Sequence, residues 1–216
     1  MTAPRSPLAH RAAELAAAPV GLRELPLLSQ VGVRLHDAPG SPPRRAGSPA
    51  GLAVVAATIG FPLPEVPNTT TGDGTRTALW LGPDEWLVVG PPGEARSLAG
   101  LLEDALPRRV GSVIPLSGNR TVLELRGRHA RDVLDAGCSL DLHPRAFGPG
   151  DCAQTLLGRA AVILHQTEIE PVYRILVRPS FAGYLADWLL DAAAGVTAAP
   201  ASPASGAASA PSSPPR

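Results

Sequence analysis

The regular alternation of short apolar runs with single helical segments is the feature that most restricts how this chain can fold. Two strand-like runs, TALWL (77–81) and EWLVVG (85–90), are separated by a few turn residues and precede a helical segment at 94–106, which ends before Pro107. Paired runs joined by a tight turn are typical of antiparallel strands, and a helix that follows them can cover one face of their sheet.

The same alternation continues on both sides of this unit. Further strands are expected at 111–116, 120–127 and 172–177, with two edge strands within 20–36 and a hairpin at 152–165 that turns at Gly158. Further helices are expected at 6–18, 128–136 and 180–193. The sequence therefore predicts an α+β fold of split βαβ, ferredoxin-like repeats, in which antiparallel sheets carry helices on one face.

Two of the expected helices carry specific packing predictions. In the helix at 180–193, large apolar residues recur at helical spacing, and this face is expected to be buried against the neighbouring sheet. These residues are Phe181, Tyr184, Leu185, Trp188 and Leu189. The helix at 128–136 stops at Gly137, a position where a left-handed residue is commonly needed.

Proline and small residues divide the chain into ordered and irregular parts. HDAPGSPPRRAGSPAG (36–51) and PEVPNTTTGDGTR (64–76) are predicted to be proline-rich insertions within one α+β domain that spans 1–194. The Ala/Pro/Ser segment at 195–216 has almost no charge and little apolar side chain to bury, so it is expected to be a disordered tail.

The charge balance and residue usage exclude several classes of function. The chain has 19 basic and 19 acidic residues, whereas a nucleic-acid surface usually needs a basic excess. All the basic residues are arginines, so a P-loop lysine and a Schiff-base lysine are excluded for this chain.

Neither a membrane span nor a secretory signal is evident in the sequence. The longest apolar stretch, GLAVVAATIGFPLP (51–64), contains two prolines and is shorter than the ~20 residues that a membrane-spanning helix needs. The N-terminus lacks a continuous apolar region, and Cys138 and Cys152 are too few for a disulfide scaffold. A cytoplasmic protein with free thiols is therefore expected.

Asp84 and Glu85, in LGPDEWLVVG (81–90), are the most obvious candidates for an acid/base pair. A general acid and a general base must face one reacting atom, whereas neighbouring carboxylates in a tight turn usually diverge. Pro83 suits the second position of a type I turn. We therefore interpret this stretch as a hairpin turn, flanked by Trp80 and Trp86 as core or interface residues.

The remaining candidate groups form no recognisable site. Cys138, His143 and Cys152 have no zinc-ligand spacing, and small buried hydrophobic residues explain the two cysteines more simply. The residue types of a catalytic triad lie close in sequence only at Ser117, His129 and Asp132 or Asp135, and nothing in the sequence positions them. The sequence therefore predicts no catalytic, cofactor-binding or metal-binding residue in this chain.

Several sequence blocks nevertheless occur in the order found in one known family. The longest is SGNRTVLELRGRHARDVLDAGCSLDLHPRAFGPGDCAQTLLGRAAVIL (117–164), and the others are SPLAH (6–10), LGPDEWL (81–87) and VRPSFAGYLADWLLDAA (177–193). Together they resemble the gamma subunits of heterotetrameric sarcosine oxidase, which are relatives of the aminomethyltransferase (glycine-cleavage T-protein) fold. The resemblance extends over most of residues 6–194.

The resemblance implies a noncatalytic subunit that packs against an alpha subunit and holds no cofactor of its own. In such complexes the alpha subunit carries NAD, FAD and a tetrahydrofolate-accepting domain, the beta subunit carries FAD and covalent FMN, and the delta subunit binds zinc. The assembly oxidatively demethylates sarcosine to glycine and transfers the one-carbon unit to tetrahydrofolate.

The same resemblance leaves an alternative, a stand-alone folate-dependent aminomethyltransferase-type enzyme or a folate-binding protein. Aminomethyltransferases bind folate through an acidic residue that has no match in this sequence, so no folate ligand is assigned. The chain is also short for their three-part fold. Whether the substrate of the complex is sarcosine or another N-methyl amine is left open by the sequence.

Overall fold

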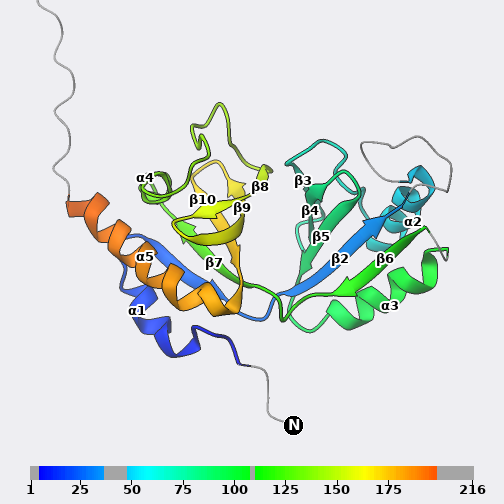
Figure 1. Cartoon of the computed structure of the whole chain (residues 1–216), viewed down its shortest axis with the longest axis horizontal. Coiled ribbons are helices and arrows are strands. Elements are labelled where there is room, and N and C mark those ends of the chain that lie inside the picture. The colour runs from blue at the N-terminus through cyan, green and yellow to red at the C-terminus, as the bar shows by residue number, and fades with distance from the viewer. Residues whose placement is uncertain (1–4, 37–47, 108–109, 199–216) are drawn as a thin grey trace, which may run out of the picture.

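Two five-stranded antiparallel sheets, set side by side, form the framework of the computed structural model, which describes residues 5–36, 48–107 and 110–198 (Figure 1). The first sheet, in the order β1-β7-β10-β9-β8, consists of β1 (Gly21–Leu25), β7 (Thr121–Arg126), β8 (Cys152–Leu157), β9 (Ala160–Glu168) and β10 (Val172–Val177). The second sheet, in the order β3-β4-β5-β2-β6, consists of β2 (Ser29–Leu35), β3 (Thr70–Gly72), β4 (Thr77–Gly82), β5 (Glu85–Gly90) and β6 (Gly111–Pro115).

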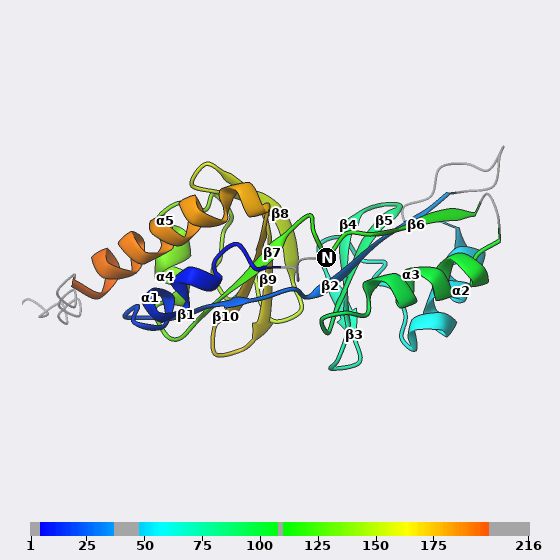
Figure 2. The same ribbon diagram turned by 90° about the horizontal axis from the view of Figure 1, so that it is seen from below.

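Each sheet carries its helices on one face, as the sequence predicted for an α+β fold. The first sheet is covered by η1 (Ala9–Arg11), α1 (Ala12–Ala16), α4 (Ala130–Asp135) and α5 (Pro179–Ala198). The second sheet is covered by α2 (Pro49–Ile59) and α3 (Ala95–Ala105) (Figure 1 and Figure 2). No helix in the described segments is long and apolar enough to cross a membrane.

Alternating side chains along the strands build three apolar cores. In β7, Leu123 and Leu125 point to the helices of the first sheet, whereas Val122 points the other way. In the second sheet, the apolar side chains on one face pack against α2 and α3 in the same way. The third core joins the two sheets, because Leu79 and Leu87 of the second sheet pack against the side of the first sheet that bears Val122.

The chain passes between the two sheets twice. It leaves the first sheet after β1, builds the whole of the second sheet, and returns at β7 (Figure 1). The strands predicted at 111–116 and 120–127 therefore exist as β6 and β7, but they belong to different sheets. The expectation of two edge strands within 20–36 is right for β1 and wrong for β2, which lies between β5 and β6.

One helix was not foreseen from the sequence. The stretch 36–51 was expected to be an insertion without regular structure, yet α2 begins at Pro49 and ends at Ile59. Its start is capped by Ser48, whose hydroxyl accepts a hydrogen bond from the amide of Gly51, and its end by Gly60 in the left-handed conformation. Residues 37–47 lie outside the described segments.

The other irregular segments also contain regular structure. The stretch 64–76 includes the short strand β3, and α5 continues to Ala198, past the domain end expected at 194. Residues 199–216, which make up most of the expected tail, lie outside the described part of the chain.

The face of α5 that was expected to be buried is only partly so. Leu185 and Leu189 are fully buried, but Phe181 and Tyr184 are 42% and 38% exposed and contact each other edge to face. Gly137 after α4 does not adopt the expected left-handed conformation. Glycine is required there for another reason, because a Cβ atom at this position would lie 2.5 Å from the ring of Trp188.

Candidate functional site

The β1–β2 connection (26–28) and the β6–β7 connection (116–120) form a strand crossing between the two sheets, which is tied together by Gln30 at the start of β2. The amide of Gln30 donates a hydrogen bond to the hydroxyl of Ser117 (3.0 Å), and its side chain donates one to the carbonyl of Arg120 (2.7 Å). Leu116 in turn donates its amide hydrogen to the carbonyl of Gln30 (2.7 Å). The strand crossing is therefore fixed by polar contacts between residues that are far apart in the sequence.

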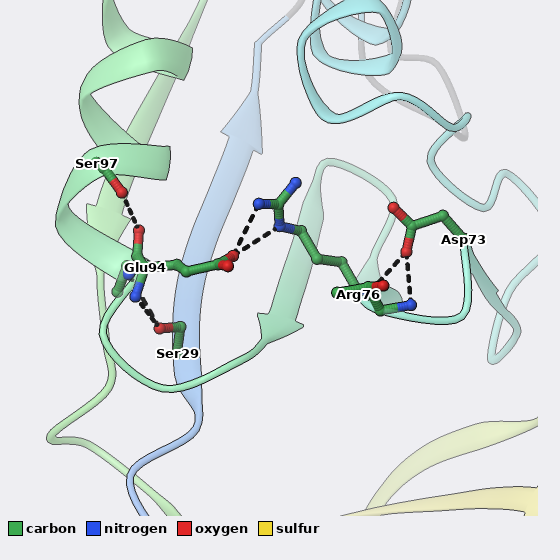
Figure 3. A network of polar contacts seen from close by, with 7 residues as sticks. Ser29, Asp73, Arg76, Glu94 and Ser97 are labelled. Atoms are coloured by element: carbon green, nitrogen blue, oxygen red, sulfur yellow. Dashed lines mark hydrogen bonds and ion pairs between the residues drawn. The ribbon is translucent and has the colours of Figure 1, made fainter.

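The start of α3 is anchored to the same crossing by a hydroxyl group from another strand. The buried side chain of Ser29 accepts hydrogen bonds from the amides of Glu94 (2.8 Å) and Ala95 (3.0 Å) (Figure 3). A helix is usually capped by the residue that directly precedes it in the sequence, whereas this cap comes from another strand. Nothing local in the sequence signals this cap, because Ser29 lies 65 residues before Glu94.

The carboxylate of Glu94 is neutralised by Arg76, which follows the β3–β4 turn. The guanidinium of Arg76 donates two hydrogen bonds to one oxygen of Glu94, at 3.0 and 2.8 Å (Figure 3). In the turn itself, Asp73 accepts hydrogen bonds from the amides of Arg76 and Thr75, and these hold the pKa of its carboxyl below the usual value. The network joins the hairpin to α3, with Asp73 held by backbone amides and Glu94 by a guanidinium.

A second polar row crosses the first sheet on the side that faces away from its helices. Glu124 of β7 is almost completely buried and forms ion pairs with Arg23 of β1 (2.8 Å) and Arg126 (3.2 Å). Arg174 of β10 is paired with Glu124 in the strand register, and His165 of β9 is paired with Arg174. Burial, together with the nearby charge of Arg174, lowers the pKa of His165 to about 4.

Asp84 and Glu85 form the hairpin turn that the sequence suggested. Asp84 follows Pro83 between β4 and β5, and Glu85 is the first residue of β5, where it forms an ion pair with Arg34 of the neighbouring strand β2. The carboxylate of Glu85 is therefore engaged by a cation, and the backbone carbonyl of Asp84 accepts a hydrogen bond from Leu35. The interpretation as a turn is confirmed.

The candidate metal ligands are not gathered into a site. In the described segments, no group of three or more metal-binding side chains is close enough to hold an ion. Cys152 is buried in the core between the two sheets, where it donates weakly to backbone carbonyls. Cys138 is half-buried, and its backbone forms an isolated antiparallel β-bridge with Leu157. His143 lies in an exposed loop.

The two thiols are therefore expected to differ strongly in reactivity. Burial raises the pKa of Cys152 to about 12 from an ordinary value of 9.0, so its thiolate fraction at pH 8 is lower by about a thousandfold. Treatment with iodoacetamide should label Cys138 first and Cys152 only after unfolding in urea, as measured by peptide mass spectrometry. Equal labelling of both cysteines in the folded protein would contradict this assignment.

The candidate triad residues are also separated. Ser117 lines a pocket at the strand crossing and receives the hydrogen bond from Gln30, whereas His129 lines a different pocket beside Arg126 and Val196. The imidazole of His129 contacts Asp132 at 3.1 Å on the surface of α4. The structure thus brings the histidine and the aspartate together, and it leaves the serine in another part of the fold.

The aminomethyltransferase T of the glycine cleavage system from Bartonella henselae superposes with a TM-score of 0.54 at 15% identity, over 85% of this chain and 48% of that one. This likeness shows the fold alone, and it confirms the expected aminomethyltransferase-like class. The protein is thus an α+β chain of that type, spanning about half the length of that enzyme.

The family is defined by closer matches. Residues 44–195 match the model of the "Sarcosine oxidase, gamma subunit family". Sarcosine oxidase subunit gamma from an Arthrobacter species is 43% identical over 87% of this chain and 89% of that one. The heterotetrameric sarcosine oxidase from Corynebacterium sp. U-96 contains a chain that superposes with a TM-score of 0.80 at 38% identity, with 93% of this chain and all of that one covered. The chain belongs to the sarcosine oxidase gamma subunit family.

Proposed function

We propose that this chain is a noncatalytic subunit of a heterotetrameric sarcosine oxidase and that it supports the assembly of the flavoenzyme. The observation that carries the proposal is the extent of the match to a chain of such an assembly, which covers 93% of this chain and 100% of that one. The polar groups at the strand crossing support it, because Ser29, Arg76 and Glu94 are used to hold the backbone together.

In this proposal the chemistry takes place in the other subunits. These alpha, beta and delta subunits would hold FAD, FMN, NAD, tetrahydrofolate and zinc, and the complex would oxidatively demethylate sarcosine to glycine while transferring the one-carbon unit to tetrahydrofolate. The present chain would contribute a surface for contact with the other subunits and would supply no cofactor ligands.

Co-expression with the alpha, beta and delta subunits tests this role. The tagged chain should then co-purify with a complex that shows flavin absorbance and sarcosine-dependent oxygen uptake, while the chain purified alone shows neither property. Failure to associate with any of these subunits would contradict the proposal. Titration of the isolated chain with tetrahydrofolate is the control for the folate-binding alternative, because tight stoichiometric binding would favour that alternative.

A further inference from the structure

The strand crossing carries an apolar pocket whose exposed residues Leu27, Pro92 and Arg96 take part in none of the contacts described above. It has a volume of about 620 Å³ and is formed by three segments that are distant in the sequence. The β1–β2 connection contributes Leu27, the β5–α3 connection and the first turn of α3 contribute Pro92, Gly93 and Arg96, and the β6–β7 connection contributes Ser117 and Gly118. Because Ser29 and Gln30 lock these segments together, the pocket is a preformed feature of the fold.

Leu27 is unusual in both its conformation and its exposure. Its φ angle is +57°, in the left-handed region that leucine adopts only at a conformational cost, and its side chain is 41% exposed. Glycine or asparagine would occupy this turn with less strain. A strained apolar residue that remains in contact with water stabilises little within the chain itself, and such outliers are common at functional positions.

The charge at the pocket restricts what can cover it. Arg96 is exposed and, among the residues that the structure describes, is the only charged one that lines the pocket. Within the described segments it has no ion-pair partner, in contrast to Arg76, whose charge is taken up by Glu94. An apolar surface beside an unpaired guanidinium is complementary to an apolar side chain next to a carboxylate.

We propose that this pocket is a docking site for another subunit of the sarcosine oxidase assembly, which places an apolar side chain against Leu27 and Pro92 and a carboxylate on Arg96. The inference rests on the proposed function, since it requires a partner subunit. It adds the location of the contact and the chemistry of the partner segment. Aromatic and aliphatic residues that fill pockets, with charged groups at the rim, are typical of the energetically important part of protein interfaces.

Two substitutions test the proposal without harming the fold. Leu27→Gly removes the side chain and suits the left-handed backbone, so the unfolding temperature of the isolated chain should stay the same or rise slightly. Arg96→Glu places an acidic residue in the first turn of α3, which has none, and this also favours the helix. Neither change should weaken the fold, yet both should weaken association with the partner subunits by about tenfold or more, as measured by interferometry on the full chain.

Matched controls lie elsewhere on the surface. Ile169, which is 89% exposed in the turn between β9 and β10, can be changed to glycine. The exposed Arg159, in the turn between β8 and β9, can be changed to glutamate. Arg96→Lys should retain most of the affinity. The proposal is overturned if Leu27→Gly and Arg96→Glu bind the partners like the unmodified chain, or if both controls lose as much affinity.

Two further outcomes are distinguishable. If the unmodified chain fails to bind any partner subunit, the proposed function itself is wrong. If the unmodified chain forms a dimer by light scattering and Leu27→Gly is monomeric, the pocket binds a second copy of this chain, and the partner assigned above is incorrect.

Discussion

Replacing Trp86 with alanine is expected to lower the free energy of unfolding by about 3–5 kcal/mol, the usual cost of emptying a large aromatic site in a core. Trp86 lies on β5, which is hydrogen-bonded to β4 and to β2, and its side chain is completely buried. Its indole N–H donates a hydrogen bond to the carbonyl of Pro64 (2.8 Å). The substitution therefore opens a cavity and also leaves a buried carbonyl without its donor.

The chain provides a matched control for this prediction in Trp80. Trp80 is opposite Trp86 in the strand register, but its indole nitrogen is buried without a hydrogen-bond partner in the described part of the chain. Trp86→Phe should cost about 1–3 kcal/mol because the Pro64 carbonyl loses its donor, whereas Trp80→Phe removes an unpaired group and should cost less. Urea unfolding followed by circular dichroism measures both. Equal losses would show that the bond to Pro64 is not what distinguishes the two tryptophans.

Most strands and helices could be predicted because their signals are local, and β3 and α2 are the exceptions. The hairpin at Asp84 and Glu85 follows from a proline and two polar residues between apolar runs, and Gly158 marks the β8–β9 turn with its positive φ of 56°. The helix α2 has local boundary signals, Ser48 and Pro49 at its start and Gly60 at its end, but they adjoin a proline-rich stretch that was interpreted as an insertion. Its residues are largely alanine, valine, threonine and glycine, so an apolar run next to a proline-rich stretch looks the same whether or not it forms a helix.

The pairing of strands could not be predicted in the same way. β1 pairs with β7, so Arg23 contacts Glu124, which lies 101 residues later in the sequence. β6 pairs with β2 and not with β7, the next strand in the chain. The SGN segment (117–119) between β6 and β7 has the composition of a hairpin turn, but it connects two different sheets, and the amide of Gln30 donates a hydrogen bond to Ser117 there. The register of a sheet depends on such distant contacts, which no short pattern contains.

The same reason explains why the candidate docking site was invisible in the sequence. Leu27, Arg96 and Ser117 belong to three segments that meet only when both connections cross. Gly137 gives a further example, since its predicted role was conformational and its observed role is to make room for Trp188. A single sequence identified the family through the order of its blocks, whereas the surface that would serve assembly emerged only from the fold.

Acidification is expected to destabilise the chain through His165. Burial and the charge of Arg174 lower the pKa of this histidine to about 4 in the folded protein, from an ordinary value of 6.5. The unfolded chain therefore binds a proton more readily than the folded chain between these two values, so stability is fully present above pH 6.5 and falls as the pH decreases toward 4. The difference between the two pKa values corresponds to a loss of about 3 kcal/mol.

The contribution of His165 can be separated from that of the other titrating groups by comparing how steeply the free energy of unfolding depends on pH in each variant. His165→Gln keeps a polar side chain on β9 but cannot bind the proton, so its free energy of unfolding should change by about 3 kcal/mol less than that of the unmodified chain between pH 7 and pH 4. His143→Gln, in the exposed loop after Asp141, is the matched histidine substitution on the surface. Urea titrations at four pH values measure the three profiles. If the His165→Gln and unmodified profiles run parallel, His165 takes up its proton in the folded sheet, and its burial between β8 and β10 does not oppose the charge.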